Sequence, residues 1–177
     1  TADYMRSKER LGGKVKLFAP GGAFHIDDFS IQPFSVRHDA LDPVGFVIQT
    51  GQRKVGVALD LGCVDQLGRC RLKGCDALIL ESNYDTDLLR KSGRPLRLIR
   101  RIAGRNGHLS NLDAMAALDH LLARNTKHLL LGHVSEDCND YELVEKMAAE
   151  KLTRIGRDDI LCAVLRQKRS TPTYWIG

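Results

Sequence analysis

Two short apolar runs constrain the fold of this chain more than any other feature of its sequence. They are ALILES at residues 77–82 and HLLLGH at residues 128–133, and each ends in polar side chains, a pattern typical of a buried strand. The stretch between them, HLSNLDAMAALDHLLARN, predicts a helix because Met115, Leu118 and Leu122 fall on one face. Strand, helix and strand in this order predict an α/β layered domain.

The helix between the two runs has a recognisable start. Ser110 can cap it, and Asp113 three residues later resembles a capping box with Asp in place of Glu. GQR at residues 51–53 is a short glycine-containing loop between two strand patterns, which predicts a hairpin. The other expected elements are helices at 2–10 and 140–152 and strands at 14–18, 29–38 with a break at Pro33, 44–50, 54–60 and 160–167.

Length and composition indicate one soluble globular domain spanning residues 1–177, with 43% hydrophobic and 28% charged residues. No apolar run approaches membrane-spanning length, and the first stretch, TADYMRSKERLGG, lacks the apolar core of a signal peptide. The first residue is not Met, so we expect a chain that was processed or cut from a longer one.

The cysteines argue against a disulfide framework. There are five, with no Cys-x-x-Cys pair, and the spacing of Cys63, Cys70 and Cys75 matches no common zinc motif. We therefore expect reduced, mostly buried thiols in a cytoplasmic protein rather than a cysteine metal site.

Positive charge is concentrated in one window of the chain. The formal net charge is +5, yet residues 88–112 contain seven cationic side chains and no acidic one. Such a window predicts either a surface for a polyanion or a solvated helix face, and charge alone leaves both open. Its cationic residues are Arg90, Lys91, Arg94, Arg97, Arg100, Arg101 and Arg105.

Polar side chains also follow three of the predicted strands. They are His38 with Asp39, Asp60 in LDLG, and His133 in LGHVSEDCN. Polar groups that gather at strand ends, off a rigid apolar sheet, are the usual arrangement of an α/β active site. Two imidazoles and a carboxylate are also ligands that Zn²⁺ or Mn²⁺ accepts. Each residue alone could be a turn or cap residue, whereas the three together favour a metal site.

His108 lies just before the capped helix, in GRNGHLSN. The free N–H groups and positive dipole end of a helix favour an anion such as phosphate. A histidine there could hold a phosphate oxygen or protonate a leaving group, or could simply help to cap the helix.

The motifs PFSVRHDALDPVGFVI, KVGVALDLG, ALILESNYD, GRNGHLSN and LLLGHVSEDCN, in this order, resemble the metallo-β-lactamase-fold hydrolases of the YycJ/WalJ family. The resemblance covers nearly the whole chain and implies an αββα four-layer sandwich. It implies that His38 ligates one metal ion, that Asp60 bridges two ions and that His133 ligates the second. His108 matches a position that related phosphodiesterases place near the scissile phosphate.

The same resemblance implies a metal-dependent phosphodiester hydrolase, a nuclease acting on DNA, in which two zinc or manganese ions share an attacking hydroxide. Few aromatic residues accompany the basic window, so we expect contacts to the DNA backbone rather than base stacking. The residues expected to make those contacts are Arg94, Arg97, Arg100, Arg101 and Arg105.

One family motif, His-x-His-x-Asp-His, is absent from this sequence. The chain therefore resembles the C-terminal part of the family fold without its N-terminal strands. His38, Asp60 and His133 alone could hold at most one ion, so we expect none or one in this chain and leave open whether it is an enzyme by itself. Losing early strands would bare an apolar sheet face, which predicts a homodimer or a missing N-terminal segment that covers it.

Two alternatives to a nuclease remain. One is another hydrolase on the same fold, such as a thioesterase or lactonase, although RHDALDPVGF resembles the phosphodiesterase branch rather than the GHTPGS-like loop of glyoxalase-type members. The other is an inactive fragment, truncated or degenerate.

Overall fold

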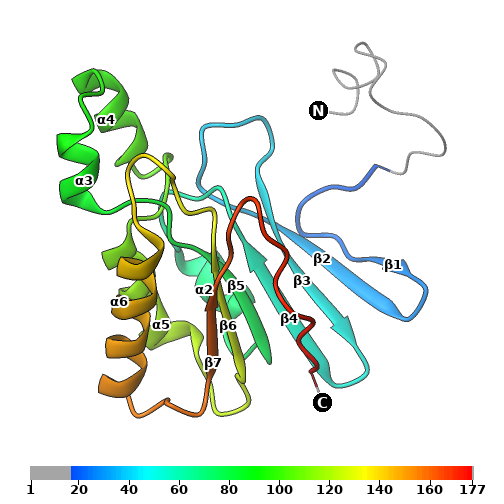
Figure 1. The fold of residues 1–177 in the computed structure, drawn as a ribbon. Coiled ribbons are helices and arrows are strands. Elements are labelled where there is room, and N and C mark those ends of the chain that lie inside the picture. The colour runs from blue at the N-terminus through cyan, green and yellow to red at the C-terminus, as the bar shows by residue number, and fades with distance from the viewer. Residues whose placement is uncertain (1–16, 177) are drawn as a thin grey trace.

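The computed structural model of the protein describes residues 17–176, which form one seven-stranded sheet with helices on one face (Figure 1). The strands lie in sequence order across the sheet. Strands β1 to β4 pair antiparallel, and β4 to β7 pair parallel. Their bounds are β1 Phe24–Ile26, β2 Phe29–Ser35, β3 Val44–Thr50, β4 Arg53–Ala58, β5 Ala77–Glu81, β6 His128–Gly132 and β7 Leu161–Val164.

A tight turn joins β3 to β4 in the antiparallel half of the sheet. Thr50 pairs with Arg53 across Gly51, whose φ of +55° is accessible to glycine without steric cost, so the hairpin predicted at 51–53 is confirmed. The break predicted at Pro33 is wrong, because β2 continues through it. The Pro33 carbonyl accepts a hydrogen bond from the Gly21 N–H (2.9 Å), which places its backbone polar groups on the side away from β3. The missing N–H of proline therefore costs no bond to β3.

Helices connect the parallel strands. The Ser110 hydroxyl accepts a hydrogen bond from the Asp113 N–H (3.0 Å), which confirms the predicted cap of α5. Asp140 caps α6 in the same way by accepting from the Leu143 N–H (3.0 Å). The bounds are α2 Gln66–Leu72, α3 Thr86–Lys91, α4 Leu96–Ile102, α5 Asn111–Leu121 and α6 Tyr141–Arg154.

The sequence missed two short elements, β1 and α2. The expected strand at 160–167 is shorter, and Leu17 and Phe18 lie in no strand. The helix expected at 2–10 and the first part of the strand expected at 14–18 fall outside the described residues.

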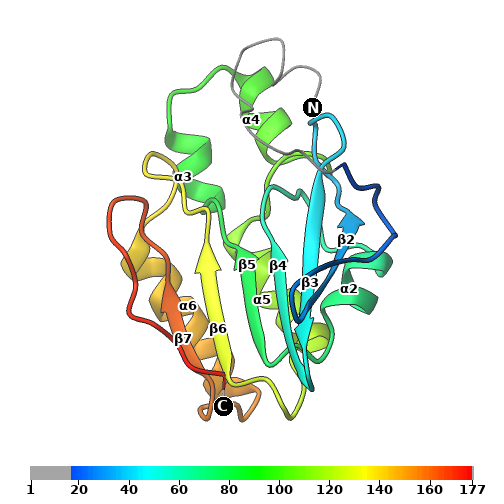
Figure 2. The same cartoon turned by 90° about the vertical axis from the view of Figure 1, so that its right-hand side faces the viewer.

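Helices α2, α5 and α6 cover one face of the sheet (Figure 2). In β2 to β7, strand residues that point toward these helices contribute to the main core. Burial of this apolar surface is the principal stabilising contribution to the fold. The sheet residues of this covered face include Val47, Ala58, Leu78, Leu80, Leu129 and Leu131, each no more than 2% exposed.

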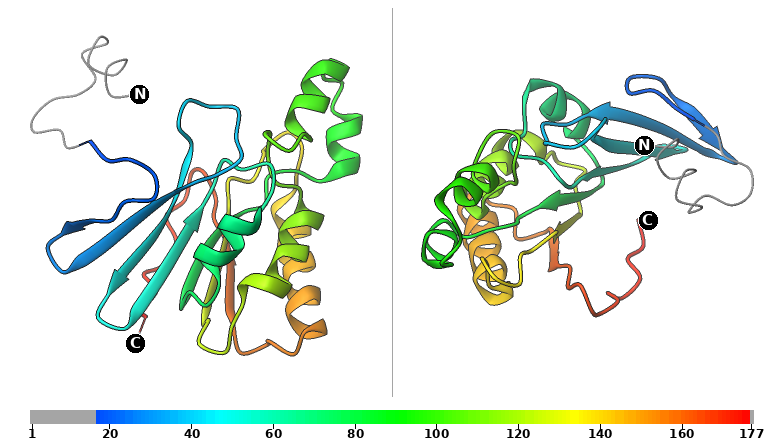
Figure 3. Two further views of the ribbon diagram at one scale, coloured as in Figure 1. Left: turned by 180° about the vertical axis from the view of Figure 1, so that it is seen from behind. Right: turned by 90° about the horizontal axis from the view of Figure 1, so that it is seen from above.

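The opposite face of the sheet, called here the open face, is also apolar but has no helix on it (Figure 3). Strand register aligns one apolar row across five strands. This row consists of Phe46, Val57, Ile79, Leu130 and Ala163, all only partly buried.

The two ends of the open face are partly shielded by the chain itself. The Phe18 ring packs against Phe24 and Phe46, with centroids 5.3 and 5.9 Å apart. At the other end His128 Nε2 lies 3.1 Å from the Trp175 carbonyl oxygen in the C-terminal segment. The middle of the row, at Val57, Ile79 and Leu130, is only partly buried. None of the helices in residues 17–176 is long and apolar enough to span a membrane.

Candidate metal centre

The candidate metal centre lies at the carboxyl edge of the parallel strands. Helices α3 and α4 lie beyond the same edge (Figure 1). Asp60 follows β4, Glu81 is the last residue of β5 and His133 follows β6. His38 comes from the loop between β2 and β3, and His108 precedes α5. Because the carboxyl ends of parallel strands meet at one edge, residues far apart in the sequence converge there.

Unusual backbone conformations hold two of these residues. Asp60 and His133 both have φ of +55°, in the left-handed region that few non-glycine residues adopt. The Asn83 side-chain amide donates a hydrogen bond to the His133 carbonyl oxygen (2.6 Å) and so helps to hold that turn. Such conformations cluster at functional sites, where surrounding contacts compensate for the strain.

The carboxylate of Asp60 lies among three imidazole rings. Its Oδ1 is 3.2 Å from His133 Nδ1, 3.9 Å from His38 Nε2 and 3.9 Å from His108 Nδ1. The His108 ring centroid lies 5.0 Å from that of His38 and 5.1 Å from that of His133. The structure therefore brings together all four residues that the sequence singled out for this site.

Glu81 is a site residue that sequence reasoning missed. Its side chain is fully buried, and Oε1 lies 2.7 Å from His108 Nδ1 and 3.0 Å from His133 Nδ1. Its Oε2 accepts a hydrogen bond from the Leu61 N–H (2.7 Å). Burial favours the neutral acid, but the three hydrogen bonds outweigh burial and hold the pKa of Glu81 below its ordinary value. Glu81 is therefore a buried anion.

Hydrogen bonds fix the orientation of the imidazole rings. His38 Nδ1 lies 2.8 Å from the Gly107 carbonyl oxygen, which can only accept, so Nδ1 carries the proton and Nε2 is free. Glu81 accepts from Nδ1 of His108 and His133 in the same way, and this bond raises the pKa of His133 against the effect of burial. A histidine whose other nitrogen donates to a carboxylate or carbonyl is the usual form of a metal-binding imidazole.

The donor set fits a divalent cation. Ligand atoms of Asp60, Glu81, His108 and His133 all lie within 4.8 Å of one another. Two ligands on one tetrahedral zinc ion are about 3.4 Å apart, given metal–ligand distances of about 2.1 Å. The distance from Asp60 Oδ1 to His38 Nε2, the ring nitrogen that carries no proton, is 3.9 Å and close to that value. Nδ1 of His108 and of His133 donates to Glu81, so these two rings would bind a cation through Nε2. Mixed nitrogen and oxygen donors suit Zn²⁺ and Mn²⁺.

Gly107 lies between α4 and His108 in the sequence, and its surroundings leave no room for a side chain. A Cβ atom at this position would lie 2.2 Å from the carbonyl oxygens of Arg101 and Ile102. The adjacent His108 N–H donates to the Ile102 carbonyl (2.8 Å), so the end of α4 and the metal centre are tightly connected. A larger residue at 107 would displace the carbonyl that orients His38.

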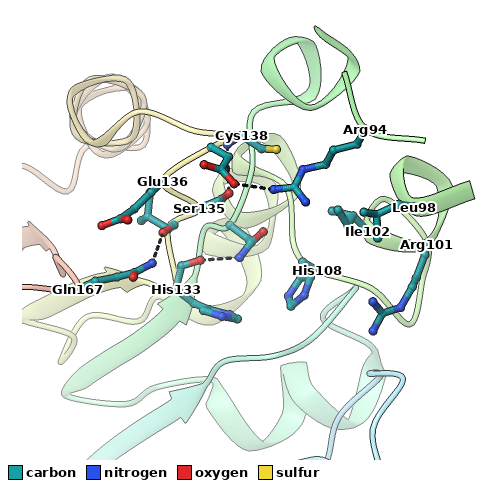
Figure 4. A pocket seen from close by; sticks show the side chains of 13 residues that line it. Arg94, Leu98, Arg101, Ile102, His108, His133, Ser135, Glu136, Cys138 and Gln167 are labelled. Atoms are coloured by element: carbon teal, nitrogen blue, oxygen red, sulfur yellow. Dashed lines mark hydrogen bonds and ion pairs between the residues drawn. The ribbon is translucent and has the colours of Figure 1, made fainter. Parts of the chain in front are cut away.

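A pocket of about 430 Å³ opens beside the centre, between α4 and the loop after β6 (Figure 4). His108 and His133 line it, together with Arg94 and Arg101. Arg94 Nη2 lies 2.7 Å from Asp137 Oδ2, and Arg101 forms a bidentate ion pair with Asp39. The basic window therefore divides into two sets. Arg97, Arg100 and Arg105 are exposed, and no ion pair or side-chain hydrogen bond involves them among residues 17–176.

The five cysteines are unpaired, as expected, although only Cys75 and Cys138 are buried. Within the described part of the chain, the group of residues able to hold a metal ion contains no cysteine.

Comparison with known proteins identifies the family. The model of the β-lactamase superfamily domain matches residues 2–134. The chain belongs to the β-lactamase superfamily. Similar curated proteins include exodeoxyribonuclease YycJ of Bacillus anthracis, 32% identical over 140 residues (79% of this chain and 53% of YycJ). Exodeoxyribonuclease WalJ of Streptococcus pneumoniae is 30% identical over 154 residues (85% of this chain and 57% of WalJ). This superfamily member thus spans about half the length of these relatives.

Solved structures agree on the fold. YhfI from Bacillus subtilis, a metallo-β-lactamase fold protein, matches with a TM-score of 0.65 and 16% identity over 93% of this chain and 59% of YhfI. Zn²⁺-bound PqqB from Methylobacterium extorquens matches with a TM-score of 0.54 and 18% identity over 84% of this chain and 48% of PqqB. The expected α/β metallo-β-lactamase fold and the resemblance to YycJ and WalJ are confirmed. The fold and the four-residue donor set also support divalent-metal binding by this superfamily member.

Proposed function

We propose that this chain contributes the catalytic edge of a metal-dependent phosphodiesterase that cleaves DNA. The observation that carries the proposal is the meeting of His38, Asp60, His108 and His133 at the strand ends, next to a pocket lined by Arg94. The curated relatives named exodeoxyribonucleases support DNA as the substrate.

His38, Asp60 and His133 are the proposed metal ligands. A divalent cation held there would activate water and stabilise negative charge that develops on the phosphoryl oxygens. Glu81 holds the His133 ring through Nδ1, so Nε2 is the nitrogen that would bind the cation. The residues of this chain have room for one ion, and further ligands would be needed for a second ion of zinc or manganese.

His108 is the proposed proton donor. Its Nδ1 is held by buried Glu81, and its ring lines the pocket where a phosphodiester would lie. With Nδ1 bonded to Glu81, Nε2 is the ring nitrogen that could pass a proton to a leaving oxygen. This is the carboxylate-supported arrangement of a general acid.

The arginines of the basic window are the proposed contacts to the DNA backbone. Arg97, Arg100 and Arg105 are exposed on or beside α4 and available to phosphates. Arg94 and Arg101 lie closer, at the pocket. Each phosphate contact releases counterions, so binding should weaken steeply as salt concentration rises.

Hydrolysis assays test the proposed activity. The purified chain, with Mn²⁺ or Zn²⁺ added, is incubated with bis-p-nitrophenyl phosphate, with single-stranded DNA and with a thioester. Cleavage of both phosphodiesters but not of the thioester is expected. Asp60→Asn is the matched control, because Asn also tolerates positive φ while it removes the ligand charge. Thioester turnover without diester turnover would contradict the proposal, and no turnover at all would favour the inactive-fragment alternative.

Metal content after dialysis provides a second test. At most one equivalent of metal per chain is expected, and less in Asp60→Asn. Two equivalents bound to the unaltered chain would contradict the single-ion assignment.

We also propose that the open face is covered in the functional protein, by a second copy of this chain or by a further segment of the same protein. Its apolar row across β3 to β7 is partly exposed, and exposed apolar patches favour association. Light scattering of the chain alone should show a dimer or larger species, and Val57→Lys should shift it toward monomer. A monomer at all concentrations would contradict self-association.

A further inference from the structure

We infer that the pocket beside the metal centre is a subsite for a DNA phosphate that neighbours the scissile one, with Arg94 as its receptor. Asp137 occupies that receptor when no DNA is bound. The inference rests on the proposed function and adds that the Asp137 carboxylate competes with a DNA phosphate for Arg94.

The Arg94–Asp137 pair lies in the pocket next to the metal centre. Arg94 precedes α4, Asp137 lies in the loop after β6, and their side chains meet across the pocket (Figure 4). His108 and His133 line the same pocket, so a phosphate on Arg94 would lie close to a diester at the metal centre. The apolar side chains of Leu98 and Ile102 line the α4 side of the space, suited to the sugar between two phosphates.

The chemistry of the pair carries the second step. A guanidinium presents paired N–H donors that match carboxylate and phosphate equally well in geometry. Asp137 is 74% exposed and Arg94 31% exposed, so water and salt screen their attraction. A phosphate approaching the pocket, where Arg101 is the second lining cation, can therefore displace the carboxylate.

Among the arginines on or near α4, Arg94 is the one that lines the pocket without a partner next to a proposed metal ligand. Arg97 and Arg100 do not line the pocket and would contact phosphates farther along the strand. Arg101 lines the pocket too, but its partner Asp39 adjoins the proposed ligand His38, so a change there would also disturb the metal centre. The Arg94–Asp137 pair is therefore the one that separates phosphate binding from metal binding.

The inference predicts opposite effects from the two halves of one ion pair. The probe is a fluorescein-labelled single-stranded DNA oligonucleotide, titrated with the chain in EDTA so that no hydrolysis occurs, with anisotropy as the readout. Arg94→Gln should weaken binding by about tenfold and lower the slope of log affinity against log salt by about one. Asp137→Asn should tighten binding by about twofold to fivefold, because the competitor has gone.

Asp159→Asn is the matched control. Asp159 pairs with Lys127 (2.8 Å), which precedes β6 and so lies at the opposite edge of the sheet from the pocket. It changes the net charge as much as Asp137→Asn does. Tighter binding by Asp137→Asn than by Asp159→Asn is therefore specific to the pocket.

The outcomes are distinct. Weaker binding by both Arg94→Gln and Asp137→Asn, with unchanged melting temperatures, would show a structural bridge and overturn the inference. Binding by the unaltered chain that Arg94→Gln leaves unchanged would overturn the inference alone. No binding by the unaltered chain would overturn the DNA substrate of the proposed function together with this subsite.

Discussion

Both faces of the sheet carry apolar side chains, but they differ in what covers them. Along β6, Leu129 and Leu131 point to α5 and α6 and are 0% exposed, whereas Leu130 between them is only partly buried. Along β5 the same alternation places Leu80 on the covered face and Glu81 on the other side. Yet Glu81 is also 0% exposed, because His108 and His133 cover it.

This contrast separates folding from function. The covered face supplies a complete core and fixes the strand ends, whereas the open face has an apolar surface with no helix to pack against. At the carboxyl edge, polar rather than apolar groups cover the open face, because His108 and His133 lie over Glu81 there. The metal centre therefore lies at strand ends that the covered core holds in position.

The largest effect is expected from a matched pair of substitutions in β6. Leu131→Ala removes fully buried methyl groups and should lower the free energy of unfolding by about 2–5 kcal/mol. Leu130→Ala, one residue earlier on the open face, should cost about 1 kcal/mol because its side chain is only partly buried. Urea denaturation measures both. Both substitutions are made in the Val57→Lys background, in which no second copy should cover the open face, and equal losses there would break the comparison.

Thiol labelling sharpens the comparison from the covered side. Cys75 and Cys162 both pack toward the covered core, and burial raises the pKa of each thiol to about 11. Their thiolate fraction at pH 8 is lower by about a hundredfold than that of an ordinary thiol, so Ellman's reagent should modify exposed Cys70 first. Rapid modification of Cys75 or Cys162 in the folded chain would show that the covered core opens readily.

A substitution at Glu81 tests the part of the open face that His108 and His133 cover. Glu81→Gln keeps the size of the side chain but removes the charge that orients His108 and His133. We expect metal affinity to fall by about tenfold to a hundredfold, since carboxylates that hold ligating histidines contribute on that scale. Calorimetric titration with Zn²⁺ measures it, with Asp159→Asn as the control for charge. Unchanged affinity would show that Glu81 has only a structural role.

The sequence predicted the regular parts of this molecule. Apolar runs located β3 to β7, and the Ser110 cap located α5, because these depend on neighbouring residues. The convergence of His38, Asp60 and His133 could also be expected, since each follows a strand of one sheet.

Features set by tertiary contacts were not predictable. β1 has three residues, too few for a periodicity, and Pro33 is tolerated only because of which side its backbone faces. Glu81 ended a predicted strand, but its partners are 27 and 52 residues away in the sequence. Its importance follows from burial, which the sequence does not reveal.

The smallest effect expected is the pH dependence that the Glu81–His133 bond gives to the metal-free chain. The raised pKa of His133 stabilises the fold fully below its ordinary value of 6.5, and this contribution is lost as pH rises through the raised pKa. The lowered pKa of Glu81 stabilises the fold above its ordinary value of 4.5, and this contribution is lost as pH falls through the lowered pKa. The bond therefore contributes most between pH 4.5 and 6.5.

Urea midpoints from pH 4 to 8.5 should decline above 6.5 in the unaltered chain and decline less in Glu81→Gln. Parallel curves for the two proteins would show that the bond does not link proton binding to folding.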